Sequence, residues 1–214
     1  MNVFYLPDAR EGNVSFPEEE SKHIVRVLRM REGDTFCVTN GKGSLFDAEL
    51  IDAHPKRAMA NLLNRREGYD NRAFKLSIAI APTKLNERTE WFLEKATEIG
   101  IDEIKLFASY HSERRVVNVE RFKKIVVAAM KQSVKSNMPI IEEMQTFENL
   151  VRQDFHGQKF IAWIDEEVKD QLCNLYDKGS DVLVLIGPEG DFSKDEVELA
   201  IASGFVPVSL GEAC

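Results

Sequence analysis

Long apolar runs are missing from this 214-residue sequence, and no stretch approaches the roughly 18 to 20 residues that a helix needs to span a bilayer. Residues 1–10 also lack the basic and then apolar pattern of a secretion signal. We therefore expect a cytoplasmic protein without a membrane partner. The length allows one or two domains with a sizeable core.

Cysteine is scarce. Cys37, Cys173 and Cys214 are far apart and odd in number, which argues against a disulfide framework and against a zinc site. The four histidines show no spacing typical of metal ligands either. We expect buried thiols in a reducing compartment and no metal.

Several motifs of ligand binding and catalysis do not occur. No G-x-G-x-x-G follows a predicted strand, and no G-x-x-x-x-G-K-[ST] is present, so the spacing excludes the common dinucleotide-binding and P-loop sites. The G-x-S-x-G turn of α/β-hydrolases is missing as well.

Positive charge is in deficit overall but unevenly distributed. The net charge is −8, yet residues 1–145 hold 23 Lys and Arg against 22 Asp and Glu, while residues 146–214 hold 5 against 14. Two basic clusters lie in the neutral part. They are Lys22, Arg26, Arg29 and Arg31, and then Arg114, Arg115, Arg121, Lys123, Lys124, Lys131 and Lys135. Such clusters are typical of phosphate-binding patches, although a solvated helix face would have the same pattern.

The first 70 residues predict a small β-rich unit. Short strands are expected at residues 3–6, 36–39, 45–52 and 58–64, with Asn40-Gly41 as a hairpin turn. A helix is expected at residues 17–28, begun by a capping box from Ser15 to Glu18. Its buried side would carry Ile24, Val25 and Leu28, and its outer side Lys22, Arg26 and Arg29.

The remaining sequence alternates between strands and helices, which predicts an α/β layer with a mostly parallel sheet. We expect strands at residues 76–81, 104–107, 160–164, 182–186 and 205–210. Helices are expected at residues 87–99, 119–134, 169–176 and 194–203, with Gly100 ending the first. Residues 67–72 form the expected linker, so the predicted domains are residues 1–70 and 71–214.

A glycine-rich corner follows the strand at residues 182–186 and contains Gly187, Pro188, Glu189 and Gly190. Ser193 and Glu196 form a capping box that would start the next helix. Ligands of such sheets bind beyond the carboxyl ends of strands. We predict a cofactor held by backbone groups at this corner and at a second one, Leu210-Gly211. A strand-turn-helix corner without a ligand would have a similar sequence.

Several motifs together resemble those of the RsmE family, SPOUT-class enzymes that methylate N3 of a uridine in 16S ribosomal RNA with S-adenosylmethionine. The resemblance covers essentially the whole chain. The matching segments are H-I-V-R-V-L-R at 23–29, K-A-T-E-I-G at 95–100, S-E-R at 112–114, Q-S at 132–133 with M-P at 138–139, I-G-P-E-G-D-F-S at 186–193 and L-G at 210–211.

This resemblance implies a SPOUT-type α/β methyltransferase domain with a C-terminal trefoil knot, preceded by a PUA-like β-barrel domain. It also implies a homodimer that acts on ribosomal RNA or the small ribosomal subunit. The sequence ends at Cys214, before the L-R-x-E-T segment and last helix of the family, so we expect a missing tail. Two positions depart from the family pattern: Asp191 replaces a glycine, and Val134-Lys135 replaces a Gly-Arg pair.

Site residues follow from the resemblance. The expected cofactor contacts are Ala162, Ile164, Gly187, Pro188, Glu189, Gly190, Leu210 and Gly211. The expected catalytic residues are Arg114 and Arg115, and the expected RNA contacts are Lys22, Arg26, Arg29, Lys84 and Arg88. No residue is identified as the base; Glu189 is a candidate, but a carboxylate that bonds the local turn is the alternative. Two other functions stay open: a noncatalytic RNA-binding or ribosome-assembly protein, and a knotted methyltransferase for a ribose 2′-hydroxyl or another base.

Overall fold

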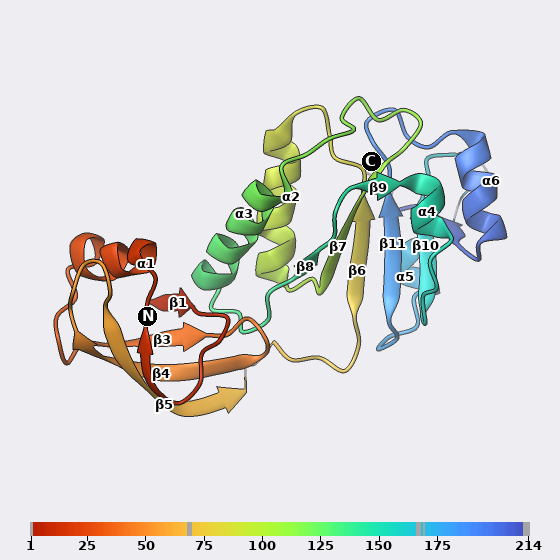
Figure 1. The fold of residues 1–214 in the computed structure, drawn as a ribbon. Helices are drawn as coiled ribbons and strands as arrows, with labels where there is room; N and C mark the ends of the chain where they lie inside the picture. Colours follow the sequence, from red (N-terminus) through yellow and green to blue (C-terminus); the bar gives the residue numbers. More distant parts are fainter. Residues whose placement is uncertain (1, 68–69, 166–167, 169, 212–214) are drawn as a thin grey trace. The chain divides into compact units, whose positions relative to one another are not determined.

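The computed structural model describes residues 2–67, 70–165, 168 and 170–211. The chain forms two compact units (Figure 1). The first unit comprises Met1–Asn71 and Val127–Met138, and the second comprises Arg72–Val126 and Pro139–Cys214. The segment Val127–Met138 thus packs with the first unit. The predicted division near residue 70 places this segment in the second domain instead.

The first unit is a five-stranded sheet in the order β1-β3-β4-β5-β2. Its strands are β1 (Val3–Tyr5), β2 (Gly12–Ser15), β3 (Thr35–Thr39), β4 (Ser44–Asp52) and β5 (Met59–Glu67). β1 runs parallel to β3, and the other neighbours are antiparallel. Phe4, Phe16 and Phe36 pack edge to face or tilted in the core, with ring centroids 5.1 to 6.0 Å apart. The strands that the sequence predicts are confirmed, and β2 was not predicted.

The helix of the first unit begins differently from the prediction. α1 (Glu18–Lys22) continues into a π-helical turn, η1 (His23–Val27), and Pro17 precedes it without a side-chain cap. The predicted capping box at Ser15 is therefore wrong, because Ser15 ends β2 and pairs with Met59. Ile24 is buried as expected, but Leu28 is exposed.

The second unit is built on a parallel sheet in the order β12-β10-β11-β6-β7-β8, with β9 pairing to β7. Its strands are β6 (Leu76–Ile80), β7 (Glu103–Ala108), β8 (Ile140–Ile141), β9 (Gln145–Thr146), β10 (Gln158–Ala162), β11 (Val182–Ile186) and β12 (Val206–Val208). Its helices are α2 (Asn86–Ile99), the first part of α3 (Val119–Gln132), α4 (Phe147–Val151), α5 (Leu172–Leu175) and α6 (Lys194–Ala202). The predicted parallel α/β layer is confirmed.

Several local predictions for the second unit can be compared with the structure. Gly100 ends α2 at φ +110°, and both halves of the capping box at Ser193 and Glu196 are present. The helix predicted at residues 169–176 is shorter, and α4 was not predicted. The expected knot would be completed beyond Gly211, outside the described residues, and stays a prediction.

The structure also bears on two expectations, that the thiols are buried and that no segment spans a membrane. Cys37 is buried, but Cys173 is exposed, so the expectation of buried thiols is wrong there, and Cys214 lies outside the described residues. Within the described part of the chain, no helix combines the length and hydropathy required to cross a bilayer.

Candidate cofactor site

The corner between β11 and α6 is packed into the core of the second unit by Phe192. The Phe192 ring is stacked with Phe107, with centroids 6.1 Å apart and planes 4° from parallel. A Cβ on Gly187 would lie 3.0 Å from the Phe192 ring, and a Cβ on Gly190 would lie 3.0 Å from Cβ of His111. Both glycines thus lie in tight places, where an added Cβ would force a neighbouring side chain to move by a few tenths of an ångström. The sequence interpretation, close approach to a bound ligand, stays a prediction.

The second corner follows β12. Gly211 has φ +136°, and its N–H donates to the Ser209 hydroxyl at 3.2 Å. The Ser209 N–H donates to the Asp170 carbonyl, and the Ser209 carbonyl accepts from Leu172. These bonds fix the end of β12 against the chain that leads to α5.

The two corners and the end of β10 enclose one cavity of about 260 Å³. Its lining residues are Ala162, Trp163, Ile164, Asp165, Val168, Ile186, Gly187, Pro188, Glu189, Asp191, Val208, Ser209, Leu210 and Gly211. Of the predicted cofactor residues, Gly190 is outside this lining and faces His111 instead. The structure brings the other seven together, and their roles as cofactor contacts stay predictions.

Sequence reasoning missed several lining residues, among them Trp163, Asp165, Asp191 and Ser209. Each of them is next to a predicted residue at a strand end. The rule that ligands bind beyond the carboxyl ends of strands could have found them.

Among the described residues, the charged side chains of this lining are all acidic: Asp165, Glu189 and Asp191. An acidic cavity favours a cationic ligand and disfavours a nucleotide phosphate. The chemistry of the walls therefore suits a positively charged cofactor with an apolar part.

Glu189 connects the cofactor corner to the loop after β6. Its Oε1 accepts a hydrogen bond from the Lys84 N–H at 3.1 Å, across 105 residues of sequence. The expected alternative was a bond within the local turn, and the observed partner lies on another loop. The carboxylate therefore holds two strand ends together.

Lys84, Glu113, Arg114, Arg115 and Val116 line a second hollow of about 350 Å³. The Arg114 guanidinium donates to the carbonyls of Thr83 and Lys84 at 3.1 and 2.5 Å, and Arg115 donates to the Tyr110 carbonyl at 3.0 Å. Lys84 pairs with Glu113 at 2.8 Å, and this hydrogen bond raises the pKa of the lysine. The structure thus brings the two predicted catalytic arginines and Lys84 together.

Glu196 ties the loop with these arginines to α6. Its carboxylate closes the capping box with Ser193 and also accepts from the Ser109 hydroxyl at 3.0 Å and the Tyr110 N–H at 2.8 Å. One side chain therefore fixes both the start of the helix and the loop that leads to Arg114.

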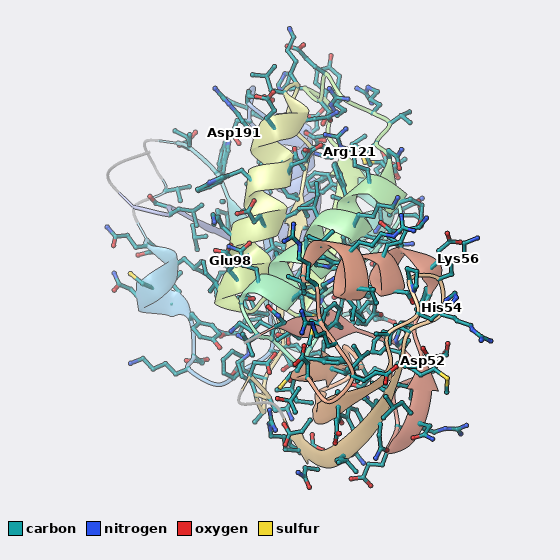
Figure 2. All side chains as sticks on the ribbon, turned by 90° about the vertical axis from the view of Figure 1, so that its left-hand side faces the viewer. Asp52, His54, Lys56, Glu98, Arg121 and Asp191 are labelled. Carbon is teal, nitrogen blue, oxygen red and sulfur yellow. The ribbon has the colours of Figure 1, made fainter. Side chains whose placement is uncertain are left out.

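The basic clusters of the sequence have different surroundings. Arg26 and Arg29 are exposed in the first unit as expected, and exposed Lys22 pairs with Glu18 at 2.7 Å. Arg88 is exposed on α2 of the second unit. In the second cluster, Arg121 (Figure 2), Lys123 and Lys131 pair with Glu90, Glu120 and Glu20 at 2.7 to 2.8 Å. Arg121 and Lys123 stay largely exposed in these pairs, so a role of this cluster in phosphate binding stays a prediction.

For a metal ion, the described residues offer no group of three or more His, Cys, Asp or Glu side chains.

Comparison with known proteins decides the family. Residues 70–214 match the profile of the RNA methyltransferase domain, and residues 16–63 match that of the RNA methyltransferase PUA domain. This chain belongs to the RNA methyltransferase family. The resemblance to RsmE proteins that the sequence motifs indicate is thereby confirmed, as is the expected fold of a SPOUT-type domain with a PUA-like domain before it.

Several relatives of this RNA methyltransferase carry one name. Ribosomal RNA small subunit methyltransferase E of Synechocystis sp. is 29% identical over 94% of this chain and 68% of the relative. The Bacillus subtilis protein of the same name is 27% identical over 92% of this chain and 82% of the relative.

Solved structures agree with the fold. A probable rRNA-methyltransferase from Porphyromonas gingivalis is 41% identical, with a TM-score of 0.89 over 100% of this chain and 91% of that one. The Neisseria gonorrhoeae ribosomal RNA small subunit methyltransferase E, solved bound to S-adenosyl methionine, superposes with a TM-score of 0.90 at 24% identity, over 100% of this chain and 90% of that one.

Proposed function

We propose that this RNA methyltransferase transfers a methyl group from S-adenosylmethionine to N3 of a uridine in 16S ribosomal RNA. The observation that carries the proposal is the convergence of the two predicted corners on one cavity whose described charged residues are acidic. S-adenosylmethionine brings a sulfonium cation, which acidic walls attract, and a flat adenine, which apolar walls accommodate. The names of the relatives support ribosomal RNA as the substrate.

The residues of the cavity fit this cofactor. Backbone groups of Gly187–Asp191 and Leu210–Gly211 would bind the ribose and adenine, and Ala162, Ile164 and Ile186 would supply apolar contact. The acidic side chains would face a sulfonium. When bound, the cofactor supplies an electrophilic methyl group.

The chemistry requires a nucleophilic N3. The N3–CH₃ bond forms as the S–CH₃ bond breaks, and the N3 proton must leave because the neutral imide is a poor nucleophile. Arg114, Arg115 and Lys84 would stabilise the uracil anion or the adjacent phosphates. Arg114 is held by two backbone carbonyls, so its charge is already oriented before RNA binds.

We also propose that the enzyme is a homodimer. Leu85, Trp91 and Ile99 expose 54 to 77% of their surface on and just before α2. Exposed apolar side chains that gather on one helix are typical of protein interfaces. Arg88 lies on this helix too, so its proposed RNA contact and the proposed dimer compete for one surface.

The proposal is tested with methyl-labelled S-adenosylmethionine and two RNA substrates, naked 16S RNA and assembled small subunits. We expect label at one uridine, and mass spectrometry should place it on N3. The variant Arg114→Ala serves as control, because it should reduce transfer strongly while cofactor affinity stays within about threefold, the effect of losing a group that does not touch the cofactor.

The other outcomes identify the remaining candidates. Cofactor binding with label on a ribose oxygen or another base would indicate a related methyltransferase of different specificity. RNA binding without cofactor binding would indicate a noncatalytic RNA-binding protein.

A further inference from the structure

Asp191, which is labelled in Figure 2, lines the candidate cofactor cavity and has an unusual backbone conformation. Its φ is +58°, in the left-handed region, where a residue with a side chain is strained and glycine is not. Aspartate tolerates this region better than most residues, yet glycine would be better still. The hydrogen bonds of the aspartate side chain compensate for this strain.

Both oxygens of the Asp191 carboxylate accept hydrogen bonds from backbone amides. Oδ1 accepts from the N–H of Phe192 at 2.8 Å, within the β11–α6 corner. Oδ2 accepts from the N–H of Ile164 at 3.1 Å, on the segment that follows β10. The carboxylate thus bridges two chain segments that both contribute to the cavity lining.

The backbone of Asp191 is fixed as well. Its N–H donates to the Pro188 carbonyl at 2.9 Å, which closes the turn. Its carbonyl lies 3.1 Å from Nδ1 of His111, the distance of a hydrogen bond in which this ring nitrogen would be the donor. The residue is held on three sides, so the carboxylate has a defined direction.

We propose that Asp191 is a positioning residue that sets the separation of the two cavity walls, and thereby the affinity for an adenosyl ligand. This inference rests on the proposed function. Hydrogen bonds to charged acceptors are stronger than those to neutral ones. The two hydrogen bonds of the Asp191 carboxylate join Ile164 to the loop of Gly187–Asp191, beyond the point where the pairing of β10 with β11 ends. A neutral side chain cannot replace it, because asparagine offers one acceptor and one donor where the two amides require two acceptors.

Asp191→Gly is the decisive variant. Glycine removes the bridge but suits the left-handed backbone, so the midpoint of thermal unfolding should not fall. The affinity for the ligand should fall roughly tenfold, the factor carried by one charge-assisted hydrogen bond. A merely structural role would lower the stability and leave the affinity of the folded protein unchanged.

Asp191→Gly removes a negative charge as well as the bridge between the two segments, and the two effects on ligand affinity must be told apart. Calorimetry is therefore done with S-adenosylmethionine and with S-adenosylhomocysteine, which lacks the sulfonium charge. Positioning predicts that Asp191→Gly weakens the binding of S-adenosylhomocysteine as well, whereas loss of charge alone would weaken only the binding of S-adenosylmethionine. Asp195→Asn is the matched control: it removes one negative charge from an exposed side chain in the first turn of α6, outside the cavity lining, so the affinity for S-adenosylmethionine and for S-adenosylhomocysteine should be kept.

The outcomes are distinguishable. Equal affinities of Asp191→Gly and wild type for both ligands would overturn the inference, as would a loss confined to S-adenosylmethionine. If the wild-type protein binds neither ligand, the proposed function itself fails.

Discussion

Val134 and Asp191 both have left-handed backbone conformations, but only the side chain of Asp191 makes hydrogen bonds that compensate for the strain. Val134 follows α3 with φ +57°, and the N–H groups of Val134 and Lys135 donate to the carbonyls of Lys131 and Met130. This is the C-terminal motif in which glycine normally occupies the left-handed position, as Gly100 does after α2. A β-branched side chain at this place is strained.

Replacing Val134 by glycine should therefore stabilise the first unit. Relief of the left-handed strain is worth roughly 1–2 kcal/mol and the greater freedom of glycine in the unfolded chain offsets roughly 0.5–1 kcal/mol, which leaves a net gain of up to about 1.5 kcal/mol. Urea unfolding followed by circular dichroism measures this change. Val134→Ala keeps a Cβ and should gain less, so an equal gain in both variants would refute the strain argument.

At the scale of elements, a carboxylate joins the chain after β5 to the loop after α3. Asp70 accepts from the N–H groups of Ser136 and Asn137 at 3.0 to 3.1 Å, and from the Ser136 hydroxyl. The Ser136 carbonyl in turn accepts from the Thr39 hydroxyl at 3.2 Å and the Gly43 N–H at 3.0 Å. These bonds explain why Val127–Met138 packs with the strands of the first unit.

Asp70 should make this unit sensitive to acid. Partial burial raises its pKa, but the hydrogen bonds from Ser136 and Asn137 outweigh it and the pKa is lowered. A lowered pKa stabilises the fold above the unfolded value of about 4 and ceases to do so as the pH falls through the folded value. Asp70→Asn should lower the free energy of unfolding by roughly 1–2 kcal/mol at pH 7. As the pH falls from about 5 to 3, the variant should lose less of its remaining stability than the wild type does.

Urea unfolding at a series of pH values measures the effect of Asp70→Asn. Asp154→Asn is the matched control, because Asp154 is exposed and its neutralisation should leave the pH dependence unchanged. If both variants follow the wild-type pH profile, Asp70 does not carry the acid sensitivity.

Two identical sequence patterns show how far local reasoning reaches at this scale. Serine followed three residues later by glutamate occurs at 15–18 and at 193–196. The second forms the predicted capping box, but in the first Ser15 is taken by pairing of β2 with β5, and Phe16 donates to the Ala58 carbonyl. Partners more than 40 residues away decided the outcome, and no local pattern contains them.

For the whole molecule, the sequence predicted which corners line the cavity but not what holds them together, and the binding of a cofactor there stays a proposal. Strand ends and glycines are local features, so both corners could be found. The bonds of Glu189 to Lys84, Asp191 to Ile164 and Arg114 to Thr83 cross from loop to loop. Such bonds depend on strand order, which the alternation of strands and helices leaves undetermined. Likewise, the basic cluster at Arg121 looked free in sequence because its partner Glu90 lies on another helix.

The uneven distribution of charge leads to a prediction for the enzyme as a whole. Arg26 and Arg29 are exposed on the first unit, and Arg152 and Lys178 are exposed in the acidic last third of the chain. If the first unit contacts RNA phosphates, Arg26→Ala with Arg29→Ala should lower the slope of log affinity against log salt by about 1.4 to 1.8, because each phosphate contact contributes roughly 0.7 to 0.9. Arg152→Ala with Lys178→Ala removes the same net charge and should leave the slope unchanged.

Filter binding of 16S RNA at several salt concentrations compares the two double variants. Equal slopes for both would mean that net charge alone, not the surface around η1, governs RNA binding.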